Sequence, residues 1–177
     1  MPSRRIRSNT RQYLLRLDRI LQDELTVYVR SVAHEQKAYY RDVVGGWSRK
    51  PQFRTISEIS NEVIRFKVEP HGDHKNLWIW LNRGTGLHGP KKRAYKIRPK
   101  TAPALRFQTG YSAKTAPGAQ YDVGDGSKSG AWVQKQEVTH PGIKPRGFVD
   151  DSTKNLGRTF RRNVENIIRR SARRARS

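Results

Sequence analysis

Three side chains that could bind a metal lie within four residues of each other: His71, Asp73 and His74. Imidazole and carboxylate groups are common zinc ligands, but a site needs at least three protein ligands converging on one point. Pro70 and Gly72 lie in the same short segment, where they favour a turn, and no convincing further ligand follows at a suitable spacing. We therefore expect a turn here, and the sequence predicts no metal and no cofactor.

Acid–base or nucleophilic chemistry would need a poised hydroxyl beside a base and a group that orients the base. His88 and His140 lie beside Gly-Pro and Pro-Gly steps, where packing of a turn is the commoner role. No nucleophile elbow and no lysine–serine motif occurs in the chain. We expect no enzyme, although a nuclease that uses only histidine and basic side chains would need no further motif.

Positive charge is the strongest chemical feature of the chain. It has 37 Lys and Arg against 15 Asp and Glu, a formal net charge of +22. Residues 91–100 alternate cations with Tyr95, a pattern that suits either a phosphate backbone or the solvated face of a strand. No base-reading motif occurs, so any DNA contact should be independent of sequence. The candidate contacts for DNA or an acidic partner are Arg4, Arg5, Arg7, Lys91, Lys92, Arg93, Lys96, Arg98, Lys100, Arg169, Arg170, Arg173, Arg174 and Arg176.

Composition limits the kind of protein that this can be. Only 34% of the residues are apolar, which predicts a modest core, and cysteine is absent, which excludes disulfides and thiolate chemistry. No apolar run approaches the roughly 20 residues that span a bilayer, and no apolar signal core follows the basic start. We expect a protein made in the cytoplasm, with no membrane partner.

Two amphipathic helices should frame the chain. Near the start, apolar residues recur with the spacing of one helical face, at Leu14, Leu17, Leu21, Leu25, Tyr28 and Val32. Gly45 and Gly46 would end this helix. A second helix near the end has the apolar face Leu156, Phe160, Val164, Ile167 and Ile168, and Asp150 or Asp151 could cap it.

Between the helices, patterns rich in β-branched and aromatic residues predict strands at 63–68, 77–81, 94–98, 104–107 and 131–138. Trp78 and Trp80 would then share one face of a strand. The glycine-rich residues 108–130 should form a mobile loop or a hairpin tip. We expect an α+β fold: a long N-terminal helix, an antiparallel β meander and a C-terminal helix packed on the sheet. It would comprise a basic arm at 1–12, one domain at 13–170 and a basic tail at 171–177.

Residues 139–151 combine turn signals with an apolar anchor just before the last helix. Pro141 and Gly142 set a turn, Pro145 stiffens the chain, and Phe148 precedes the helix. Upstream, residues 78–86 end in Arg-Gly-Thr-Gly. We expect these two segments to form an elbow or an interface, with the candidate residues Trp78, Trp80, Arg83, Gly84, Thr85, Pro141, Gly142, Pro145 and Phe148.

The order of these segments resembles the tail-completion and head–tail joining family of long-tailed bacteriophages. The resemblance covers roughly residues 77–169, with Gly84-Thr85, then a basic strand, then a glycine-rich loop, then His140-Pro141-Gly142 and Phe148. The family usually has Pro-Phe where this chain has Gly147-Phe148.

The resemblance implies a structural virion protein of the neck or tail top. It would form an oligomeric ring with copies of itself, beside portal-adaptor or other neck proteins and a tail terminator or tail tube protein. Genomic DNA in the channel is a further candidate partner. The alternative is a sequence-nonspecific nucleic-acid-binding protein of ribosomal or nucleoid type. The net positive charge of the chain is enough to suggest this alternative.

Overall fold

The computed structural model describes residues 3–60, 62–115 and 124–176. The chain divides into two compact units. We call residues 1–39, 54–69 and 152–177 the helical unit, and residues 40–53 and 70–151 the ribbon unit. The fold is α+β, with the long N-terminal helix and the C-terminal helix that the sequence predicts.

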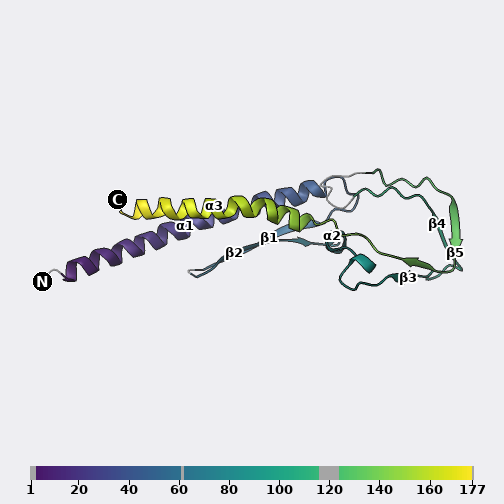
Figure 1. Cartoon of the computed structure of the whole chain (residues 1–177), viewed down its shortest axis with the longest axis horizontal. Helices are drawn as coiled ribbons and strands as arrows, with labels where there is room; N and C mark the ends of the chain where they lie inside the picture. Colours follow the sequence, from purple (N-terminus) through teal and green to yellow (C-terminus); the bar gives the residue numbers. More distant parts are fainter. Residues whose placement is uncertain (1–2, 61, 116–123, 177) are drawn as a thin grey trace. The chain divides into compact units, whose positions relative to one another are not determined.

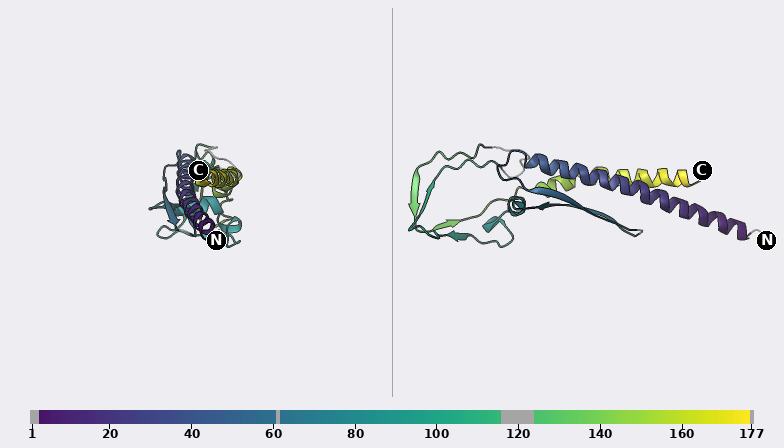
Figure 2. Two further views of the ribbon diagram at one scale, coloured as in Figure 1. Left: turned by 90° about the vertical axis from the view of Figure 1, so that its left-hand side faces the viewer. Right: turned by 180° about the vertical axis from the view of Figure 1, so that it is seen from behind.

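In the helical unit, α1 (Ser3–Val43) and α3 (Phe148–Arg176) lie side by side in both views (Figures 1 and 2). They run antiparallel, because Gln36 of α1 bonds to Ser152 while Glu24 bonds to Arg170 and Arg174. Val29, Val32, Ala33, Ile167 and Ala175 are buried. The C-terminal helix therefore packs on α1 and not on a sheet, which corrects the predicted packing partner.

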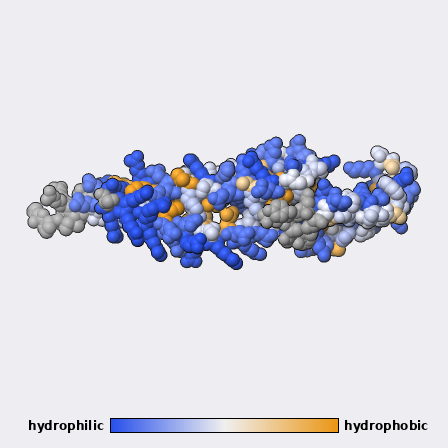
Figure 3. Space-filling model, turned by 90° about the horizontal axis from the view of Figure 1, so that it is seen from above, coloured by the Kyte–Doolittle hydropathy of each residue, from blue (hydrophilic) through white to orange (hydrophobic). Residues whose placement is uncertain are grey.

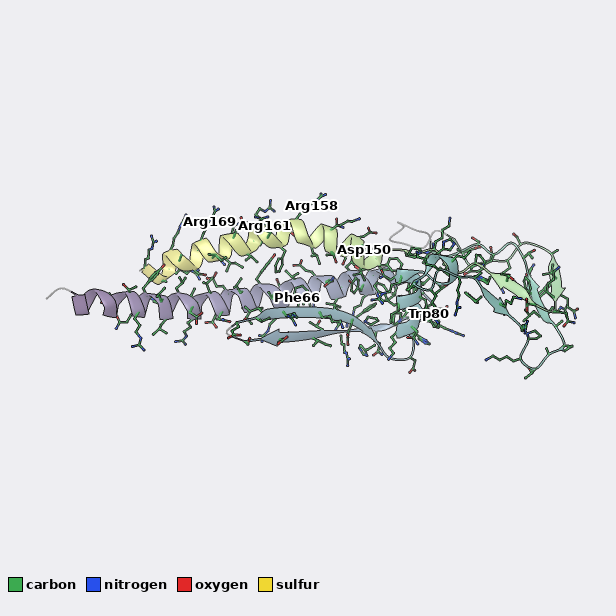
Figure 4. The ribbon with its side chains drawn as sticks, turned by 60° about the horizontal axis from the view of Figure 1, so that its bottom comes forward. Phe66, Trp80, Asp150, Arg158, Arg161 and Arg169 are labelled. Atoms are coloured by element: carbon green, nitrogen blue, oxygen red, sulfur yellow. The ribbon has the colours of Figure 1, made fainter. Side chains whose placement is uncertain are left out.

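A hairpin of β1 (Gln52–Ile59) and β2 (Ile64–His71) contributes residues 54–69 to the helical unit. Its turn is closed by the N–H of Ser60, which donates to the Val63 carbonyl at 2.9 Å. Phe66 and Thr55 line a small cavity of about 220 Å³ together with Val29 and Ala33 of α1, and Figure 4 shows Phe66 on the hairpin. One face of the hairpin therefore covers α1.

In the ribbon unit, five aromatic residues form the core: Tyr40, Trp47, Phe53, Trp78 and Phe148. The ring centroids of Trp78 lie 4.8 Å from Tyr40, 4.9 Å from Phe53 and 5.0 Å from Phe148. Pairs in this range are attractive beyond the apolar area that they bury. Trp78 is therefore the centre of this core.

Trp78 lies on a helix, α2 (Lys75–Arg83), so the strand predicted at 77–81 is wrong. Two residues along a strand share a face, whereas two residues along a helix differ by about 200°. Trp78 is accordingly 2% exposed and Trp80 is 52% exposed. The aromatic composition suggested a strand. The segment forms a helix because the spacing of Leu77, Trp78 and Leu81 places these three residues on one side of a helix.

The remaining strands form a long two-stranded ribbon in place of the predicted meander. After the 3-10 turn η1 (Gly86–His88), β3 (Tyr95–Ile97) pairs antiparallel with β6 (Val138–His140), and β4 (Leu105–Gln108) pairs with β5 (Trp132–Lys135). The chain thus runs outward through β3 and β4 and returns through β5 and β6. Pro99 and Pro103 interrupt the outgoing strand, because proline donates no ladder hydrogen bond.

The predicted loop at 108–130 is partly the end of this ribbon. A bridge joins Tyr111 to Lys128, and the Ser112 N–H donates to the Ser127 carbonyl at 2.9 Å. Residues 116–123 lie outside the described residues, and the predicted mobility stays a prediction. At the ends of the chain, α1 begins within the predicted arm and α3 runs through the predicted tail to Arg176.

No helix among the described residues is long and apolar enough to cross a membrane.

Candidate functional site

The two segments that carry the resemblance lie against each other in the ribbon unit. The Thr85 N–H donates to the Ile143 carbonyl at 2.9 Å, and the Leu87 N–H donates to the Pro141 carbonyl at 2.7 Å. The Thr85 hydroxyl accepts from the Ile143 N–H at 2.9 Å. We call this hydrogen-bonded pair of segments, 84–88 and 140–148, the elbow.

Glycine is required where the two backbones of the elbow meet. Gly142 has φ 102°, and a Cβ there would lie 1.9 Å from the Thr85 carbonyl oxygen. Gly86 has φ 61°, and its Cβ would lie 2.3 Å from the Pro141 carbonyl oxygen. Both positions combine a left-handed backbone with contact distances that no side chain can occupy. The elbow is therefore a close backbone-to-backbone junction.

Phe148 anchors the elbow in the aromatic core. Its ring stacks on Trp78 and lies 6.1 Å from Trp47. Beside it, the Arg146 N–H donates to the Leu81 carbonyl at 2.8 Å, so the chain is held to α2 immediately before α3 begins. The predicted apolar anchor thus lies in the core, between α2 and the end of α1.

Asn82 has a role that the sequence analysis missed. Its side-chain oxygen accepts from the N–H of Val149, in the first turn of α3, at 3.0 Å. The first N–H groups of a helix lack partners within the helix, and Asn82 satisfies one of them from a distant position. Asp150 and Asp151 instead lie inside the first turn, where their charge suits the helix dipole (Figure 4). Asparagine before Arg-Gly is too common a sequence to have revealed this contact.

Next to the elbow lies a groove of about 500 Å³, lined by residues of α2, the Gly84–Gly86 turn and the start of the ribbon. We call it the aromatic–basic groove. Trp80, Tyr95 and Ile79 give it an exposed apolar surface, and Figure 4 shows Trp80 on α2. Its charged lining residues are Arg83, Lys91 and Arg93, and no Asp or Glu of the described residues lines it. The groove therefore unites residues that the sequence placed in two separate candidate sets.

The rest of the basic stretch does not reach the groove. Lys96 and Arg98 form ion pairs with Glu137 on the returning strand, at 2.7 and 2.5 Å. The hydrogen bonds from Lys96 and then Arg98 hold the pKa of Glu137 below its ordinary value. Lys92 and Lys100 are exposed and do not line the groove. The alternating pattern thus separates cations that hold the ribbon together from cations that flank the groove.

Two of the C-terminal arginines also have structural partners. Arg170 and Arg174 bond to the Glu24 carboxylate of α1 at 2.8 and 2.6 Å. Desolvation opposes ionisation of Glu24, but the hydrogen bond and charge of Arg170 and the charge of Arg174 outweigh it, so its pKa lies below the ordinary value. Arg169, Arg173 and Arg176 are exposed. Arg4, Arg5 and Arg7 belong to the first turns of α1, and their side chains lie outside the described part of the molecule.

The histidines have no common site. His71 ends β2 and His74 precedes α2, and the described residues contain no group of three or more metal-binding side chains. His140 accepts the Gly142 N–H on its Nδ1 at 2.9 Å and stacks on Tyr95. His88 lies in η1 of the elbow. His140 is thus engaged in the turn that the sequence predicts there.

Comparisons with protein families, with curated proteins and with solved structures found no match.

Proposed function

We propose that this protein is a structural virion protein of the neck or tail top of a long-tailed phage. It would complete the tail and join it to the DNA-filled head as one subunit of an oligomeric ring. The proposal rests on the motif resemblance and on the character of the exposed surfaces in the ribbon unit. In this role the protein would act by binding its neighbours through interfaces and would catalyse no reaction.

The observation that carries the proposal is the aromatic–basic groove, which lies beside the elbow. The two motif segments meet in that elbow through three backbone and side-chain hydrogen bonds, which join Thr85 and Leu87 to Pro141 and Ile143. Trp, Tyr and Arg are the residues most enriched at the centres of protein interfaces, and Trp80, Tyr95 and Arg83 all line this groove. A rigid backbone junction that presents such side chains suits docking of another subunit.

The ribbon supports an assembly role in a second way. Among the described residues its strands pair only with each other, and Tyr111 and Trp132 are 61% and 62% exposed. An isolated two-stranded sheet is marginally stable in water. A neighbouring subunit that covers these aromatic side chains would stabilise it. In a head-to-tail ring, one patch meets a different patch on the next copy, so the groove and the ribbon can serve as opposite partners.

The proposed neighbours are the next copy in the ring, portal-adaptor or other neck proteins on one side, and a tail terminator or tail tube protein on the other. The uneven charge of the chain favours neighbours with acidic surfaces. Such charge affects the rate and salt dependence of assembly more than its final affinity. Assembly should therefore slow down as salt rises.

A stop codon at Gln12 in the parent genome tests the proposal. Electron microscopy of the lysate should show full heads beside unattached tails, or tails of aberrant length. A suppressor host that inserts glutamine at the stop codon is the control and should restore joined particles. Normal virions from the non-suppressing host would overturn the proposal and favour the alternative of a nucleic-acid-binding protein.

Complementation of the stop mutant then tests the groove. The double variant Trp80→Ala, Arg83→Gln should fold but restore few joined particles, because both side chains are exposed in the groove. Leu87→Ala is the matched control, since Leu87 is an exposed apolar residue of the elbow that does not line the groove. Equal rescue by the two variants would move the interface elsewhere.

A further inference from the structure

One face of α3 consists mainly of arginine, with Glu165 and Ala172 between the arginines. At about 100° per residue, Arg158, Arg161, Arg162, Arg169, Arg173 and Arg176 all fall within about 60° of one line along the helix. We call these six residues the arginine stripe. Figure 4 shows Arg158, Arg161 and Arg169 pointing away from α1, and hydrophilic residues dominate the face shown in Figure 3. The opposite face of α3 holds Phe160, Ile167, Ser171 and Ala175, which pack toward α1.

The charge of the stripe is largely uncompensated. Arg161 pairs with Glu165 on the same helix at 3.1 Å, in an exposed contact that contributes little. The other five arginines of the stripe have no ion pair in the part of the chain that the structure describes. Arg170 and Arg174 differ, because they point to the side of α3 that meets Glu24. The fold thus separates two arginines that pair with α1 from the arginines of the stripe, although both sets are exposed.

The length of the stripe matches an extended anion. Residues 158–176 span about 27 Å at 1.5 Å per residue. Duplex DNA carries about one negative charge per 1.7 Å of its axis, so many phosphates lie within reach of this length. Guanidinium groups bind phosphate oxygens through two parallel hydrogen bonds, which makes arginine well suited to this contact.

The residues that the stripe lacks indicate which anion it fits. None of the six positions, nor Glu165 and Ala172 between them, is aromatic, whereas binding of single strands relies on stacking of bases on aromatic rings. Arginine can contact guanine in the major groove, but six copies of one side chain offer no pattern that would select one base sequence. An interface with an acidic protein would be expected to have an apolar centre, and here the centre of the stripe is charged.

We propose that the arginine stripe of α3 binds the phosphate backbone of duplex DNA without reading its sequence. The stripe includes Arg158, Arg161 and Arg162, which the sequence analysis did not select, and it omits Arg170 and Arg174, which it did. The inference is independent of the ring proposed above. It holds for a neck protein and for any other role of the chain.

Binding of the full-length protein to a fluorescent 30-base-pair duplex tests the proposal by anisotropy between 50 and 200 mM KCl. Six phosphate contacts predict a slope of log affinity against log salt of about −5. The stripe variant replaces all six arginines with glutamine. The matched control replaces six exposed cations of the ribbon unit with glutamine: Arg41, Arg49, Lys50, Lys75, Lys128 and Lys135.

The stripe variant should bind at least about 100-fold more weakly than the wild type at 50 mM KCl, because the released counterions supply most of this affinity. The control loses the same charge and should stay within about 5-fold, since it lacks the aligned contacts. Equal losses in the two variants would overturn the proposal, because binding would then follow total charge. Tighter binding to a single-stranded 30-mer, or full competition by polyglutamate of equal charge, would also overturn it.

Circular dichroism should show unchanged helix content in both variants, because the stripe faces solvent. If the six-residue variant does not fold, two triple variants keep the test decisive. Arg158→Gln, Arg161→Gln, Arg162→Gln and, separately, Arg169→Gln, Arg173→Gln, Arg176→Gln should each reduce the salt slope by about 2.7. An unchanged slope in both triple variants would place the DNA contact elsewhere.

Discussion

The helical unit and the ribbon unit bury different kinds of residues. The helical unit joins α1 and α3 mainly through small and aliphatic side chains and one ring pair, Tyr28 with Phe160, and the Glu24 ion pairs lie along the same seam. The ribbon unit instead has a compact aromatic core around Trp78 and a backbone junction at Gly86 and Gly142. The helical unit therefore spreads its stability over many small contacts, whereas the ribbon unit concentrates it in a few residues.

This difference predicts how strongly a single substitution should destabilise each unit. A long seam loses little when one contact is removed, because its neighbours remain. A core of five rings loses much when one ring is removed, because each ring touches several others. The surfaces of the two units also differ. The helical unit exposes the arginine stripe, whereas the ribbon unit exposes single aromatic residues beside the three cations of the groove.

The largest expected effect is that of Phe148→Ala. The ring is 2% exposed and stacks on Trp78, so its removal should cost about 3–5 kcal/mol of unfolding free energy. Ile168→Ala on the same helix is the control and should cost less than about 1 kcal/mol, because Ile168 is 46% exposed. Chemical denaturation of both variants measures the difference. Unchanged stability in Phe148→Ala would show that the ring does not belong to a core.

Gly142→Ala should have the next largest effect. The new methyl group would overlap the Thr85 carbonyl, and the backbone there is left-handed, so we expect a loss of about 2–3 kcal/mol. Gly157→Ala on α3 is the matched control, since nothing lies within 4 Å of its Cβ and alanine favours a helix by up to about 1 kcal/mol. Thermal melts should thus move in opposite directions for the two variants. A stable Gly142→Ala protein would mean that the elbow can open without loss.

Glu24→Gln tests the seam of the helical unit and should have the smallest effect. The folded pKa of Glu24 lies below its ordinary value of 4.5, so the ionised carboxylate stabilises the fold above that pH. The stabilisation is lost as the pH falls through the lowered pKa. At pH 7 the variant should melt about 2–4 °C below the wild type, and the two should converge in more acidic solution.

Glu165→Gln is the control for this prediction, because its pair with Arg161 is exposed and lies within one helix. It should leave the melting temperature nearly unchanged at every pH. A constant difference between Glu24→Gln and the wild type down to low pH would contradict the role of the charge.

The two units also differ in how far the sequence predicted them. The apolar faces of both helices follow from a spacing of three and four residues. Val32, Phe160 and Ile167 lie on those faces as expected, whereas Leu14 and Ile168, predicted on them too, are exposed. The strand at 77–81 failed because aromatic composition outweighed the spacing of Leu77, Trp78 and Leu81. In a segment as short as the nine residues of α2, composition can indicate a strand while periodicity indicates a helix. The packing of Trp78 against Tyr40 and Phe53 favours the helix.

In the candidate site, too, local features could be predicted from the sequence and contacts between distant residues could not. The turn residues Gly84, Pro141 and Gly142 were predicted from local chemistry, because glycine and proline restrict the backbone wherever they occur. The contact of Asn82 with the first turn of α3 could not be predicted, since it joins positions 67 residues apart. The division of the cations likewise depended on where Glu24 and Glu137 lie in space.

The α+β class, the two amphipathic helices, the turns of the elbow and the excess of positive charge could all be predicted from residue order alone. These features depend on residue type and local spacing, which act through steric limits and the burial of one helical face. The packing of α3 on α1, the burial of Trp78 beside an exposed Trp80, and the pairing of Arg170 and Arg174 with Glu24 became known from the three-dimensional structure. Those outcomes depend on contacts between distant segments, whose energies no local pattern contains.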